Sequence, residues 1–221
     1  GYNKLYYNIQ LQNTFQGVPV SAYVDQLVGT QITGRTSGVT AVVDNVLLAE
    51  DSERGNLTLY VAYIGSSTSN NSTQTFADGE ELTSNTTISS GLLGNSSITS
   101  GSPFAITIAQ NAAATGSCFQ IQEGVYFIRG QFVKVEQQTL ILEQYNNQAN
   151  YRVGLAVNEE IINSDMDETL NDNSQGFNNY SAPGADRLKI TLSLFKKPLD
   201  DFDDNAFVEE AEVVEGILKS K

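Results

Sequence analysis

Short runs in which apolar and polar residues alternate recur along the chain, and most of them are followed within a few residues by Gly, Pro, Asn, Asp or Ser. Alternation with a period of two is typical of a β-strand that buries one face. In the first half it predicts strands at 5–11, 30–43 with bends at Gly34 and Gly38, 42–48 and 57–64. In the second half it predicts strands at 125–135, 139–143, 151–157 and 188–195.

The spacing of these strands predicts an all-β fold with two β units. Several short strands between residues 20 and 104 indicate a small barrel or sandwich, inserted into a second antiparallel β domain formed by residues 1–19 and 105–198. Long polar loops connect the strands, and the acidic, Asn-rich stretch 159–176 is expected to be a loop with a helical turn. Residues 199–221 are expected to form an acidic C-terminal extension that leads into a further part of a longer chain.

Two segments need a closer interpretation. We interpret residues 125–135 as one strand with a bulge at Gly130, in which Tyr126, Ile128 and Phe132 share a face and Lys134 is a further candidate for that face. Residues 207–214 fit either a strand or one to two helical turns, because their apolar spacing does not distinguish the two.

Residues 179–190 predict a rigid turn that leads directly into a strand. Pro183 fixes its own φ, and Gly184 provides the freedom that a tight turn needs. Two charged residues follow and can hold the turn in place, before alternation begins at 188–194. The predicted structural turn and candidate interface consists of Tyr180, Pro183, Gly184, Asp186 and Arg187.

The composition of the chain argues against several classes of function. The formal net charge is −14, so the chain repels phosphate backbones and we expect no nucleic-acid partner. No apolar run approaches the ~18 residues of a membrane span, so we expect no membrane insertion. Cys118 is the only cysteine and histidine is absent, which removes an intrachain disulfide, a thiolate zinc site and the commonest general base. We therefore predict no catalytic residue, no metal and no cofactor.

Three local features could carry chemistry, and each has a structural interpretation that we favour. The acidic stretches 165–172 and 200–204 could hold Ca²⁺, but a solvated acidic loop and a charged surface face or linker fit them better. Arg35 could bind an anion, but a turn residue paired with a nearby carboxylate is the simpler interpretation. Paired carboxylates for glycoside hydrolysis have no local motif here.

The strongest resemblance lies in the segments 123–133, 139–145, 151–155, 159–162 and 178–192, with a weaker one at 33–41. The most specific part is Tyr-x-Ala-Pro-Gly-Ala-Asp-Arg at 180–187. These segments resemble a domain of uncharacterised function that recurs in virion structural proteins of tailed bacteriophages, especially cyanophage-like tail, baseplate or fibre components. The resemblance carries no catalytic residues.

The resemblance implies a non-enzymatic structural subunit of a phage tail, at the baseplate or fibre-attachment region of the virion. Its expected partners are other phage tail proteins and further copies of itself, with indirect contact with the host surface also considered. The alternative is an adhesin whose first β unit binds a glycan or receptor; tryptophan is absent, but tyrosine could stack on a sugar. A fibre-borne glycan depolymerase is a third hypothesis.

Overall fold

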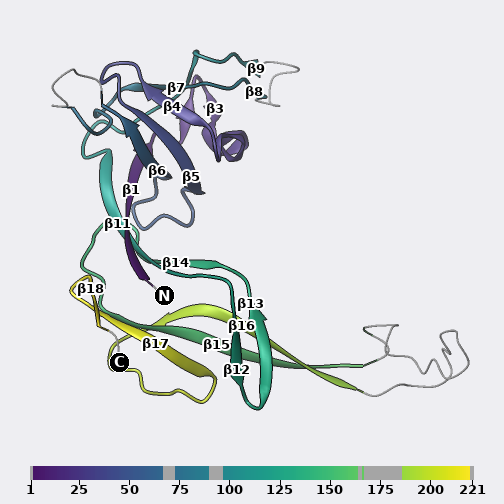
Figure 1. Ribbon diagram of the computed structural model, residues 1–221. Coiled ribbons are helices and arrows are strands. Elements are labelled where there is room, and N and C mark those ends of the chain that lie inside the picture. The colour runs from purple at the N-terminus through teal and green to yellow at the C-terminus, as the bar shows by residue number, and fades with distance from the viewer. Residues whose placement is uncertain (1, 67–72, 90–96, 164–165, 167–185, 220–221) are drawn as a thin grey trace, which may run out of the picture. The chain divides into compact units, whose positions relative to one another are not determined.

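The computed structural model describes all residues except 1, 67–72, 90–96, 164–165, 167–185 and 220–221. The fold is all-β with several antiparallel sheets, as the alternation predicts (Figure 1). The described helical residues are limited to two short 3-10 turns, η1 (Val20–Ala22) and η2 (Val24–Leu27). Within the described part of the chain, no helix has the length and apolar character needed to cross a membrane.

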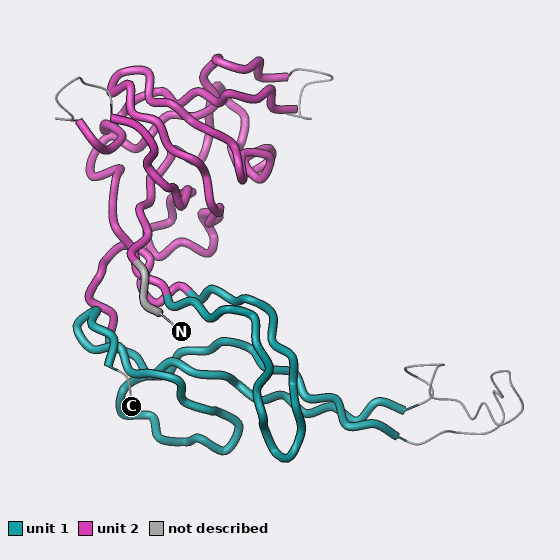
Figure 2. Tube along the Cα trace, viewed as in Figure 1, with its two compact units in different colours: residues 1–3, 119–140, 150–221 teal, residues 4–118, 141–149 magenta. Residues whose placement is uncertain are grey.

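The chain forms two compact units (Figure 2). Unit 1 contains residues 1–3, 119–140 and 150–221, and unit 2 contains residues 4–118 and 141–149. The boundary falls inside three strands, β1 (Tyr2–Leu11), β11 (Ala113–Ile121) and β14 (Gln138–Glu143). This division differs from the one expected at residues 19, 104 and 198, because strands far apart in sequence pair with one another.

Unit 2 is built on a sheet whose strand order is β10-β7-β4-β5-β6-β1-β11-β14. The strands not yet bounded are β4 (Gln31–Gly34), β5 (Thr40–Leu47), β6 (Leu57–Gly65), β7 (Glu81–Ser84) and β10 (Pro103–Ile106). Two small hairpins accompany it: β2 (Thr14–Phe15) with β3 (Val18–Pro19), and β8 (Ile88–Ser89) with β9 (Ser97–Ile98). The predicted strands at 5–11 and 57–64 are thus confirmed, as is the division of 30–43 into two strands.

The core of unit 2 follows from the pairing of β1 with β6. Ile9 lies opposite Leu59 and Leu11 opposite Leu57, and all four side chains are buried. At the corner between β4 and β5, the buried carboxylate of Glu80 accepts hydrogen bonds from the backbone N–H groups of Thr36 and Ser37, and from the Ser37 hydroxyl. A buried carboxylate is stabilised when its oxygens are occupied in this way, so the corner is rigid.

Unit 1 contains a hairpin and a four-stranded sheet. The hairpin pairs β12 (Gly124–Ile128) with β13 (Gln131–Val135). The sheet has the order β16-β15-β17-β18, from β15 (Tyr151–Ile162), β16 (Arg187–Lys197), β17 (Phe207–Val214) and β18 (Ile217–Lys219).

Three expectations for unit 1 are corrected or decided here. Residues 125–135 form two strands, so the prediction of one bulged strand is wrong. Residues 207–214 are a strand, and they join 217–219 in the sheet, so this part of the chain is integral to unit 1. The prediction of a loop from residue 159 is wrong for residues 159–162, because β15 continues to Ile162 in register with β16, and most of the expected loop lies outside the described residues.

Candidate partner-binding surface

The hairpin of unit 1 closes through a two-residue turn at Arg129 and Gly130. Both residues have positive φ, 49° and 82°, which is the geometry of a type I′ turn. Glycine adopts this conformation freely, whereas an arginine is unusual in it. The Arg129 guanidinium explains the exception: it forms an ion pair with Glu159 of β15 at 2.6 Å and donates to the Asn205 carbonyl at 2.8 Å. These two contacts fix the tip of the hairpin to the rest of unit 1.

The two faces of the hairpin differ in exposure. Ile128 and Val135 are buried, and Tyr126 and Val133 are half-buried, so these residues form the inner face. The outer face carries Val125, Phe127 and Phe132, whose exposed fractions are 65%, 64% and 79%. We call these three side chains the aromatic ridge.

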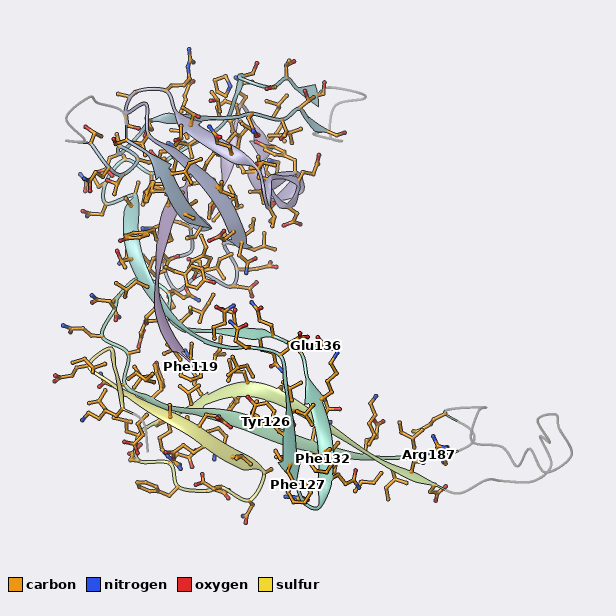
Figure 3. All side chains as sticks on the ribbon, viewed as in Figure 1. Phe119, Tyr126, Phe127, Phe132, Glu136 and Arg187 are labelled. Carbon is orange, nitrogen blue, oxygen red and sulfur yellow. The ribbon has the colours of Figure 1, made fainter. Side chains whose placement is uncertain are left out.

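The ridge is continuous. Phe127 and Phe132 lie directly opposite each other on the two strands, with ring centroids 5.0 Å apart. Figure 3 shows both rings together near the closed end of the hairpin. The expectation that Phe132 and Lys134 share a face with Tyr126 and Ile128 is therefore wrong, because the tight turn after Ile128 places Phe132 opposite Phe127.

The charges of the hairpin and of the two residues that flank it balance. Residues 123–136 contain two acidic and two basic side chains, in a chain whose formal net charge is −14. Lys134 forms an ion pair with Glu136 at 2.6 Å, and Arg129 is paired with Glu159. The ridge is thus an apolar, locally neutral area on an acidic protein.

A hollow of about 290 Å³ lies beside the ridge. The hollow lies between the hairpin tip, Val157 of β15, the end of the 201–204 loop and the start of β17. Its lining consists of Phe127, Ile128, Arg129, Val157, Asp204, Asn205, Phe207 and Val208. We call it the tip hollow. Because Phe127 belongs to both features, the ridge and the tip hollow are contiguous.

One wall of the tip hollow is held in place by Arg152, whose side chain is buried. Its guanidinium donates to both carboxylate oxygens of Asp204, at 3.0 and 2.7 Å, and also to Glu209 and to the Asp201 carbonyl. The hydrogen bonds to Asp204, followed by those to Glu209, raise the pKa of Arg152 above its usual value. A bidentate pair between a buried guanidinium and a carboxylate fixes the 201–204 loop relative to the sheet.

This network also decides between the interpretations of the acidic stretch 200–204. Asp201 and Asp204 are engaged by Lys197 and Arg152, so the stretch is a loop anchored by two cations of the protein itself, rather than a linker. Across the described residues, no group of three or more Asp, Glu or Cys side chains could hold a metal ion.

The other predicted residues are placed as follows. Arg35 forms an ion pair with Glu81, which confirms the interpretation of a turn residue paired with a carboxylate. Asp186 and Arg187 are exposed, and Arg187 begins β16 opposite Ile162. Tyr180, Pro183 and Gly184 lie outside the described residues, as does most of the stretch 165–172.

Sequence reasoning missed the aromatic ridge, although one signal was available. Most strands of this chain alternate, but Val125, Tyr126, Phe127 and Ile128 form an unbroken apolar run. In an antiparallel pair such a run places apolar side chains on both faces, so a second covering layer is required on one of them. In unit 1 the inner face is covered and the ridge is not.

Comparison with known proteins adds one family. The model of a family described as Domain of unknown function (DUF4815) matches residues 70–220. This range includes the whole hairpin and the four-stranded sheet of unit 1. Searches of curated proteins and of solved structures each returned no match.

Proposed function

The chain belongs to the DUF4815 family, and from that premise we propose that it is a non-enzymatic structural subunit of a bacteriophage tail. It acts at the baseplate or fibre-attachment region, by assembly with other tail proteins. The family description assigns no activity, so support comes from the sequence resemblance to virion structural proteins and from the surface of unit 1.

The observation that carries the proposal is the aromatic ridge. From their exposed fractions, its three side chains present on the order of 400 Å² of apolar surface, taking ~150–250 Å² for a whole aromatic side chain. A contiguous apolar patch of this size is about as large as the largest patch on a typical soluble monomer, and such patches are often interaction sites. In a subunit of an assembly, such a patch would be covered by a neighbouring protein.

The ridge is also presented rigidly. The type I′ turn, the two contacts of Arg129 and the buried Arg152 together hold the hairpin tip and the neighbouring loop. Binding to a rigid surface loses little conformational entropy, so more of the contact energy remains as affinity. The acidic remainder of the surface favours basic areas on other tail proteins, which steers docking more than it strengthens it.

Purified virions of the phage that encodes the chain test this proposal. Quantitative mass spectrometry of the particles should find the chain in a fixed stoichiometry with known tail proteins, and antibody labelling should place it at the baseplate end. Particles that lack the chain while infected cells contain it would overturn the proposal. Shortening of host-surface polysaccharide by the purified chain would instead establish a depolymerase.

A specific observation in unit 2 favours a second candidate, the adhesin. Tyr7 and Tyr63 meet edge to face, with centroids 5.7 Å apart, in an open hollow of about 430 Å³ whose lining includes Gln74 and Thr75. A half-exposed aromatic ring beside polar groups suits stacking against a sugar. Binding on a glycan array that Tyr7→Ala abolishes and Leu5→Ala retains would support this function; an array with no bound glycan would exclude it.

A further inference from the structure

We propose that the aromatic ridge and the tip hollow form one self-complementary interface, through which the chain binds a second copy of itself about a two-fold axis. The inference deepens the proposed function, and its role in a tail rests on that function. In a two-fold interface, the residue that one copy inserts must find its receptor on the same surface of the partner. The hairpin tip offers a projecting group and a receptor side by side.

The projecting group is Phe132, which is the most exposed large apolar side chain among the described residues, at 79%. The receptor is the tip hollow of about 290 Å³, with Val157, Phe207 and Val208 among its apolar walls. A cavity of ~150 Å³ is enough to bind a benzene molecule, so the tip hollow has room for a phenyl ring. In the two-fold arrangement, Phe132 of each copy enters the tip hollow of the other.

Charge favours a second copy over another kind of partner at this surface. Two chains of formal net charge −14 repel each other, and they can approach only where the local charge is small. Residues 123–136, with two acidic and two basic side chains, are such a place. The acidic loop that walls the tip hollow is partly neutralised by Arg152, which pairs with Asp204, and by Lys197, which pairs with Asp201. A basic partner would gain most from the acidic surfaces, and would gain nothing electrostatically from a neutral ridge.

The apolar area of the interface determines how tightly two copies are expected to bind. The ridges of two copies together contribute on the order of 800 Å², below the ~1,200 Å² at which stable interfaces begin. The walls of the two hollows add to this. We therefore expect a weak dimer in free solution, with a dissociation constant on the order of 10 µM.

Sedimentation equilibrium of the full chain over a concentration series measures this association. We expect a monomer–dimer equilibrium that Phe132→Ala and Val208→Glu each weaken by about tenfold or more, the first by removing the inserted ring and the second by placing a charge in the tip hollow. Ile217→Ala removes a side chain that is exposed to a similar degree elsewhere in unit 1, and should leave the equilibrium unchanged. Circular dichroism of each variant establishes that it is folded.

Mixing the two weakened variants isolates the reciprocal geometry. The Val208→Glu chain retains Phe132, and the Phe132→Ala chain retains the tip hollow, so the mixture restores one of the two insertions. We expect the mixture to associate more strongly than either variant alone. Equal association of the mixture and the separate variants would overturn the two-fold insertion.

A wild-type chain that stays monomeric up to ~1 mM would overturn the interface outright, and so would a dimer unaffected by Phe132→Ala. These results are separable from failure of the proposed function. A monomeric chain that is found in virions contradicts only the interface. A dimer that follows the expected variant pattern but is absent from virions contradicts only the tail assignment.

Discussion

Replacing Tyr23 by Phe removes a single hydroxyl from the core of unit 2. Tyr23 is buried, and its hydroxyl donates a 2.6 Å hydrogen bond to the carbonyl oxygen of Phe104. Phe104 lies where the pairing of β10 with β7 shifts register, between Pro103 and Ala105. The side chain of Tyr23 therefore satisfies a backbone carbonyl at an irregular point of the ladder.

The expected loss of stability follows from the buried carbonyl of Phe104, which is left without its donor. A buried hydrogen bond contributes ~1 kcal/mol net, and a buried acceptor without its partner costs ~1–3 kcal/mol. We expect Tyr23→Phe to lower the free energy of unfolding by about 2 kcal/mol. For a chain of this size that corresponds to a Tm lower by roughly 4–8 °C.

Tyr60→Phe is the matched control, because the same hydroxyl is removed from an equally buried ring of unit 2. The Tyr60 hydroxyl is buried, and no hydrogen-bond partner is found for it among the described residues. Removing it relieves an unfavourable burial, so we expect a change between zero and ~1 kcal/mol in the stabilising direction.

Urea unfolding followed by far-ultraviolet circular dichroism compares the two variants with the parent chain. We expect a lower urea midpoint for Tyr23→Phe and an unchanged or higher midpoint for Tyr60→Phe. The slope of the unfolding free energy against urea concentration should be the same for all three chains. If both variants were destabilised by similar amounts, the loss would come from the van der Waals contacts of the hydroxyl oxygen, and the argument from hydrogen-bond satisfaction would be refuted.

Three further predictions concern both units. Gly154→Ala should destabilise unit 1 by about 3 kcal/mol or more, because the added methyl group would overlap the Val208 carbonyl and lie 2.8 Å from the Glu209 Cα. Gly124→Ala is the control: its methyl group would meet nothing closer than 3.8 Å, so the Tm should be unchanged. Arg152→Met should lower the Tm and make the 201–204 loop sensitive to limited proteolysis; resistance equal to that of the parent would contradict its anchoring role. Burial raises the pKa of Tyr23 and Tyr63 from 10.0 to about 12, so the folded state holds these two protons more tightly than the unfolded state does. Their contribution to the free energy of unfolding is therefore complete below pH 10 and should be lost as the pH rises towards 12. Measuring the free energy of unfolding across this alkaline range would detect the loss.

The sequence predicts most of the strands because alternation is a local property. Strand β6 illustrates this, since its alternation at 57–64 is visible without any knowledge of the fold. The pairing of strands is not local. The contact of β1 with β6 joins residues about fifty positions apart, and residues 4–11 belong to unit 2 together with β6.

The hairpin shows why the candidate site was harder to predict than the fold. A two-residue turn is normally signalled by Asn-Gly or Asp-Gly, and this one is Arg-Gly. The arginine is stabilised at positive φ by Glu159, thirty residues later in the chain, so the signal is tertiary. Which face of the hairpin is covered depends in turn on the sheet of unit 1. The predicted turn around Pro183 remains a prediction.

We propose that this chain is a structural subunit of a phage tail, and its copy number in intact particles tests that proposal. Quantitative mass spectrometry of purified virions, calibrated against a tail protein of known stoichiometry, should give a constant integer ratio across preparations. Absence from the particles, or a trace amount that varies between preparations, would contradict a structural role in the tail.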